Sequence, residues 1–203
     1  MDSLVEMLAR VVVLAACLTQ VMAGLAVLVR QVRVRRPAPA ERLRGPLGLV
    51  NYAGLAGFVL VASTVAITGI GTVVGSGEGA DAVRAGGIVV LWAAGLLAAW
   101  GVRAMGRNLV APAEVRPDTE LITDGPFGLV RHPLYDSIVL LWAGGALALL
   151  SPVMAVIAAA MVPAIYLRAA AEERILARHF GDRWTEYSAR VPMLLPAFGR
   201  RGR

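Results

Sequence analysis

The sequence contains no lysine, one cysteine and two histidines. Cys17 stands alone in an apolar run, so a disulfide framework is impossible. With only His132 and His179 beside it, we expect no Cys/His metal site. The net charge of +6 therefore comes from arginine alone. These arginines lie between apolar segments instead of alternating with aromatic residues along a groove, so we expect no nucleic-acid partner.

Charge is also scarce, at 17% of the residues, whereas 58% of the 203 residues are hydrophobic. A transmembrane helix needs about 20 mostly apolar residues. The apolar segments are 11–29, 48–74, 85–102, 134–150 and 153–167. Only Ser151 and Pro152 separate the last two, which predicts a tight helical hairpin. The sequence thus predicts an all-α integral membrane bundle of about five transmembrane helices.

The arginines are distributed unevenly between the predicted loops. Six of them lie in residues 30–44, whereas the loop 75–84 has two acidic residues and one arginine. The positive-inside rule then predicts that residues 30–47, residues 103–133 and the C-terminus are cytoplasmic, with the N-terminus outside. We interpret the first apolar segment as a membrane span and not as a cleaved signal peptide, because acidic residues precede it and arginines follow it.

Most of the remaining charge lies in residues 103–136 and 168–190, at the two ends of the predicted hairpin. Because a hairpin brings its two ends together, we expect polar groups from both segments to meet at the membrane–cytosol boundary. These are Arg131, His132, Tyr135, Asp136, Arg168, Glu172 and Glu173.

Local sequence features support this convergence. Pro133 suits the first turn of a helix, which places His132 at or just before the N-cap. A helix N-terminus can bind a carboxylate or a ribose hydroxyl. The glycines of "TDGPFG" (123–128) allow the backbone to approach a ligand closely. Arg168 and Glu172 are four residues apart and can pair on one helix face.

Each of these residues also has an ordinary interpretation. Arginines commonly flank membrane spans, and Asp136 could cap its own helix or pair with His132. The "EER" stretch (172–174) is typical of a solvated helix face. The combination of the residues favours a functional site more than any single one does.

Two segments carry a resemblance to a known family. "LITDGPFGLVRHPLY" (121–135), an apolar hairpin and then "EERILARHFGDRWTEYSARVPMLLP" (172–196) resemble the isoprenylcysteine carboxyl methyltransferase family. That family is related to the integral-membrane phospholipid N-methyltransferases. The resemblance covers roughly the last 80 residues, and we interpret residues 1–102 as N-terminal transmembrane helices from their apolar runs. The resemblance implies a methyltransferase core over 103–203, made of a cytosolic loop, the hairpin and a C-terminal amphipathic segment.

The resemblance further implies S-adenosylmethionine (SAM) as the methyl donor, bound at the cytosolic face. The residues that would hold it are Leu121, Gly125, Arg131, His132, Pro133, Tyr135, Glu172 and Glu173. Our first hypothesis is that His132 and Glu173 hold SAM jointly, with Glu172 as the alternative glutamate. SAM carries a sulfonium, an ammonium, a carboxylate and a ribose, which glutamates, arginines and aromatic faces can bind.

The expected function is methyl transfer to a lipophilic acceptor, either an isoprenylcysteine-like carboxylate or a lipid headgroup. Arg168 or Arg190 could orient a carboxylate, whereas an amine would have to lose a proton, to Asp136 or Glu173. Two alternatives remain. One is a membrane reductase that uses NADPH in a related scaffold. The other is a transporter or assembly factor, which is disfavoured because the first three spans carry no midplane charge.

Overall fold

A computed structural model describes residues 4–33, 41–42, 45–73, 77–106, 114–117 and 119–194. The elements, in chain order, are α1 (Leu4–Arg33), β1 (Glu41–Arg42), η1 (Pro46–Leu49), α2 (Val50–Thr68), α3 (Glu78–Met105), β2 (Glu114–Val115), η3 (Gly125–Gly128), α4 (Pro133–Ala148), α5 (Pro152–Phe180) and α6 (Asp182–Arg190).

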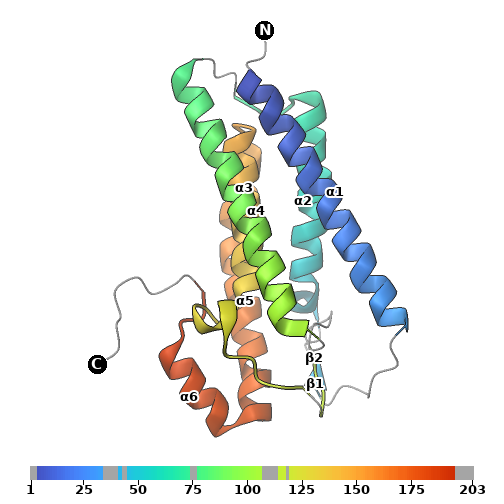
Figure 1. Cartoon of the computed structure of the whole chain (residues 1–203), viewed down its shortest axis with the longest axis vertical. Coiled ribbons are helices and arrows are strands. Elements are labelled where there is room, and N and C mark those ends of the chain that lie inside the picture. Colours follow the sequence, from blue (N-terminus) through green and yellow to red (C-terminus); the bar gives the residue numbers. More distant parts are fainter. Residues whose placement is uncertain are drawn as a thin grey trace.

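The long helices α1 to α5 run up and down the molecule as one bundle (Figure 1). Four helical segments are long and apolar enough to cross a membrane, namely Leu4–Ala23, Pro46–Thr68, Glu78–Met105 and Pro152–Phe180. The remaining predicted span, α4, is apolar but has 16 residues, or about 24 Å of helix. The predicted all-α integral membrane bundle is confirmed.

Beyond the helices, β1 and β2 form a minimal antiparallel pair, with Glu41 opposite Val115 and Arg42 opposite Glu114. The periodicity of the sequence did not predict this pair. It joins the segment after α1 to the segment after α3 at the end of the bundle where α6 lies (Figure 1). The described parts of the arginine-rich loops therefore share one end with the hairpin ends.

The helix boundaries differ most from the prediction at α5. The apolar run ends at Leu167, yet the helix continues to Phe180, because the following residues are mainly alanine, glutamate, leucine and arginine, which favour helix. Gly181, at φ 55, ends α5 and also stands as the N-cap of α6. Asp182 is the first helical residue of α6, where its negative charge is favourable.

The hairpin between α4 and α5 is as tight as predicted. Ser151 is the N-cap of α5, and its side chain accepts a hydrogen bond from the Met154 backbone N–H. The same hydroxyl donates to the Gly71 carbonyl at 2.9 Å. The bundle core lies beside this hairpin, where Phe58 of α2 meets Trp142 of α4 edge to face at 5.5 Å. The Trp142 indole donates to the Gly54 carbonyl at 3.0 Å.

Helices α3 and α4 make the most extensive contact in the bundle, and small residues allow it. A Cβ atom added at Gly87 of α3 would lie 2.7 Å from Ala148 Cα and 2.8 Å from the Gly144 carbonyl oxygen. A Cβ at Gly101 would lie 2.8 Å from the Leu134 side chain. These glycines set how closely α3 approaches α4, and therefore the position of the α4 N-terminus.

We expect Gly87→Ala to lower the free energy of unfolding by about 1–3 kcal/mol, since the methyl group would collide with α4 backbone that cannot rotate away. Gly86→Ala is the matched control, because a Cβ there has nothing within 4 Å among the described residues. Both variants can be compared by denaturant titration in detergent micelles. Equal stability of the two variants would contradict the close α3–α4 packing.

Candidate functional site

The described side chains of the predicted cluster meet where α4 begins and α5 leaves the bundle. Arg131, just before α4, donates from Nε to Glu173 Oε1 at 2.6 Å and from Nη2 to Glu173 Oε2 at 2.9 Å. This two-pronged geometry is the strong form of an arginine–carboxylate pair. Its Nη1 donates to the carbonyls of Ser188, at 2.8 Å, and Val191. Arg131 thus ties α5 to the end of α6.

His132 is the N-cap of α4 and Pro133 occupies the first helical position, as predicted. The His132 ring is buried and stacks parallel to the Tyr135 ring, with centroids 5.0 Å apart. Its Nε2 lies 3.3 Å from Glu173 Oε1, a contact that becomes an ion pair only when the histidine is protonated. Its backbone N–H donates to the Met193 carbonyl at 3.2 Å. The start of α4 is therefore held by both α5 and the segment after α6.

Tyr135 connects α4 to the other glutamate. Its hydroxyl donates to Glu172 Oε2 and accepts a hydrogen bond from Arg168 Nε at 2.9 Å. Arg168 is 2% exposed, and its Nη1 donates to the Leu47 carbonyl of η1. The sequence indicated that Arg168 and Glu172 can pair on one helix face; the structure links them through the Tyr135 hydroxyl. A buried guanidinium needs such partners, because an unpaired charge costs several kcal/mol to bury.

A cavity of about 110 Å³ opens beside this chain of polar groups, between α5, α6 and the segment around β2. Three predicted site residues line it, namely Leu121, Arg131 and Glu172. The lining residues that the sequence did not predict are Met105, Val115, Thr119, Glu120, Ile122, Phe127, Ile175, Leu176, Phe180, Trp184 and Tyr187. The sequence could have predicted two of these residues. Ile175 and Leu176 lie three and four residues after Glu172, so all three share one face of the helix.

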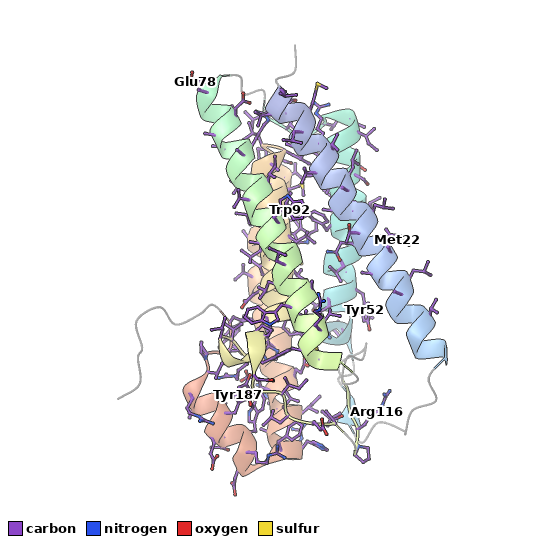
Figure 2. The ribbon with its side chains drawn as sticks, viewed as in Figure 1. Met22, Tyr52, Glu78, Trp92, Arg116 and Tyr187 are labelled. Atoms are coloured by element: carbon purple, nitrogen blue, oxygen red, sulfur yellow. The ribbon has the colours of Figure 1, made fainter. Side chains whose placement is uncertain are left out.

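Helix α6 closes the cavity with two aromatic side chains, of which Tyr187 is labelled in Figure 2 at the lower end of the molecule. The Tyr187 hydroxyl donates to the Phe127 carbonyl at 2.7 Å. Burial raises the pKa of Tyr187 to about 12, with Arg131 opposing the rise and Glu173 adding to it. The hydroxyl therefore stays protonated at neutral pH and keeps its donor role. Trp184 packs against Tyr187 and lies 5.9 Å from the Arg131 guanidinium carbon.

Four further predicted residues lie neither in the cavity lining nor in the hydrogen-bonded polar cluster described above. Asp136 is buried in the first turn of α4. Pro133 is also buried and packs beside Gly101 of α3. Gly125, at φ 58, packs against α3, because an added Cβ would lie 3.3 Å from Trp100 Nε1. Arg190 is exposed on α6, and its Nε donates to the Glu186 carbonyl of the same helix at 3.2 Å.

We searched the described residues for side chains that could bind a metal ion. No group of three or more histidine, cysteine, aspartate or glutamate side chains there is arranged to hold a metal ion. The polar groups at the base of the hairpin instead combine carboxylates, guanidinium groups and aromatic rings. Such a set suits an organic ligand that carries both charges and an apolar part.

Part of this chain is similar in sequence to known proteins. The sequence profile described as "Phospholipid methyltransferase" matches residues 83–183. Over 94 residues the chain is 30% identical to Protein-S-isoprenylcysteine O-methyltransferase B of Arabidopsis thaliana. The aligned segment covers 45% of this chain and 48% of that protein. Over 85 residues it is 35% identical to a nickel-cobalt-cadmium resistance protein of Alcaligenes xylosoxydans xylosoxydans, which covers 40% of this chain and 38% of that protein. The matched segments thus span less than half the length of either relative.

Proposed function

Because residues 83–183 place this chain in the phospholipid methyltransferase family, we propose that the protein transfers a methyl group from SAM to a lipophilic acceptor. The observation that carries this proposal is the position of Glu172. Glu172 lines the cavity, and its carboxylate is joined, through Tyr135, to the buried Arg168. Glu172 therefore connects the cavity, which suits a soluble donor, with a buried cation that could orient an acceptor from the membrane.

The residues around the cavity fit the chemistry of SAM. The Glu172 carboxylate suits an ammonium or a pair of ribose hydroxyls, and apolar residues such as Ile122 and Ile175 suit an adenine ring. The aromatic rings of Phe127 and Trp184 suit a sulfonium. When bound, SAM supplies an electrophilic methyl group, and its transfer releases S-adenosylhomocysteine. The task of the protein is then to orient the acceptor and exclude water.

The surroundings of Arg168 favour an acceptor carboxylate. A carboxylate is ionised at neutral pH, so its oxygen can take the methyl group and form an ester without losing a proton. An amine must lose a proton to gain a methyl group. Glu173, one of the two candidate bases, is already bound to Arg131 by two hydrogen bonds. Asp136 is then the remaining base for an amine, and Arg168 the orienting cation for a carboxylate.

We also propose that the end of the bundle holding α6 faces the cytosol. Strand β1, which belongs to the arginine-rich segment before α2, and the polar cluster of the hairpin lie at this end. The positive-inside rule places arginine-rich loops in the cytoplasm. Water-soluble SAM would then reach the cavity from the cytosol, whereas the acceptor would arrive from the bilayer. The described part of the chain offers this arrangement without a separate soluble domain.

Methyl transfer can be measured with the purified protein in lipid nanodiscs and SAM labelled on the methyl group. We expect label to appear in N-acetyl-S-farnesylcysteine. Shortening its farnesyl tail to five carbons should lower kcat/KM at least about 10-fold, because each buried CH₂ contributes about 0.8 kcal/mol. Phosphatidylethanolamine tests the amine alternative in the same assay. Tight binding of NADPH with no binding of SAM would contradict the proposal and favour the reductase.

A further inference from the structure

One face of helix α2 follows the hairpin along its length. Leu47 of η1 gives its carbonyl to Arg168, and Gly54 gives its carbonyl to Trp142. A Cβ atom at Gly54 would also touch Ile138 of α4 at 3.4 Å and Met161 of α5 at 3.7 Å. Asn51 lies between Leu47 and Gly54, four and three residues away, so it occupies the same face. It therefore points toward the hairpin at the level between Arg168 and Met161.

Asn51 is unusual on this face because its side chain is polar. Its Oδ1 atom is buried, and no described residue gives it a hydrogen bond. A buried amide oxygen without a donor is costly in any protein interior. Polar groups within a membrane bundle that face its interior commonly mark a functional site. Asn51 is the second residue of α2, and α2 begins at the end of the bundle that holds the candidate site (Figure 1).

We infer that Asn51 binds the head group of the acceptor and selects one that carries an N–H next to the methylated carboxylate. This inference rests on the proposed function. On the hairpin side, Arg168 brings a guanidinium charge to the Leu47 carbonyl, at the start of the face that carries Asn51, and this charge suits a carboxylate. The Oδ1 atom of Asn51 adds a hydrogen-bond acceptor to which no described residue donates. An amide N–H beside the carboxylate, as in an S-alkylated cysteine, satisfies both groups at once.

Asn51 also lies outside residues 83–183, where the family profile matches. The matched segment supplies the hairpin, whereas α2 supplies the wall that faces it. Selection by a residue on α2 would let chains with the same hairpin differ in the acceptor that they use. A site built to hydrogen-bond a substrate N–H disfavours the analogue that lacks it, because the buried polar group is then left unpaired.

The test compares two acceptors with the same tail and carboxylate. N-acetyl-S-farnesylcysteine carries the amide N–H, whereas S-farnesyl-3-mercaptopropionate has hydrogen in place of the acetamido group. For wild type we expect kcat/KM to be about 10-fold higher with the first acceptor. In Asn51→Leu this preference should disappear through a raised KM for the first acceptor. The affinity for SAM should stay unchanged. Thr64→Val is the control, because it removes an exposed hydroxyl from the same helix.

Equal loss of kcat/KM for both acceptors in Asn51→Leu would indicate a structural role and overturn the inference, as would an unchanged preference. Equilibrium binding of the same two lipids needs no turnover. A wild-type protein that transfers no label would refute the proposed function. The binding measurement would still test the role of Asn51 in that case. Without turnover, tighter binding of the amide-bearing lipid by wild type, but not by Asn51→Leu, would still support the role of Asn51. Equal binding by both proteins would overturn it.

Discussion

Replacing Arg131 with leucine should lower methyl transfer at least about 100-fold and destabilise the protein by about 3 kcal/mol, the lower end of the cost of removing one partner from a buried ion pair, because this pair is partly buried. The physical reason is the number of partners that this side chain holds. Its guanidinium binds both oxygens of Glu173 and the carbonyls of Ser188 and Val191. Without it, the Glu173 charge stays in a half-buried position and α6 loses its tie to α5.

Denaturant titration and the labelled-methyl assay measure the two effects separately. Arg103→Leu is the matched control, because Arg103 is an exposed arginine in the last turn of α3. Arg131→Lys should recover part of the stability but not the full activity, since an ammonium cannot reproduce the two-pronged geometry. Wild-type activity in Arg131→Leu would show that α6 is not needed to close the cavity.

The second large effect is expected at Glu172. Glu172→Gln should weaken SAM binding about 10- to 150-fold, because a hydrogen bond to a charged group contributes about 1.5–3 kcal/mol. Glu172 lines the cavity directly, so the loss should appear in the affinity and only weakly in the stability. Calorimetric titration in detergent gives the affinity, and Glu186→Gln on the exposed face of α6 is the control.

Glu173 offers the internal comparison. Our sequence hypothesis gave the joint SAM contact to His132 and Glu173, and this remains untested. In the structure, however, Glu173 is bound to Arg131, with His132 beside it. We therefore expect Glu173→Gln to lower stability more than affinity. The combination Tyr135→Phe with Glu172→Gln should be non-additive, since the two side chains share a hydrogen bond. A loss of affinity confined to Glu173→Gln would restore the original hypothesis.

The sequence by itself determined the features that depend on local order. The length of the apolar runs required helices that span a membrane, and the Ser151–Pro152 step required a hairpin. That hairpin in turn required Arg131 and Tyr135 to meet Glu172 and Glu173. The cap at His132 followed from Pro133, whose ring fits the first turn of a helix. Each of these properties is set by neighbours in the chain, so a periodic pattern or a turn signal is sufficient to predict it.

Only the tertiary structure decided which partner each side chain takes. Glu172 and Glu173 are adjacent in sequence but about 100° apart around α5, so the rotation of α5 against α4 gives one to Tyr135 and the other to Arg131. That rotation depends on close packing of whole helices, such as the approach of α3 to α4 at Gly87. The packing of whole helices also places Asn51 beside the hairpin and Trp184 at the cavity. Their places depend on distant surfaces fitting together, and no local pattern in a single sequence carries that information.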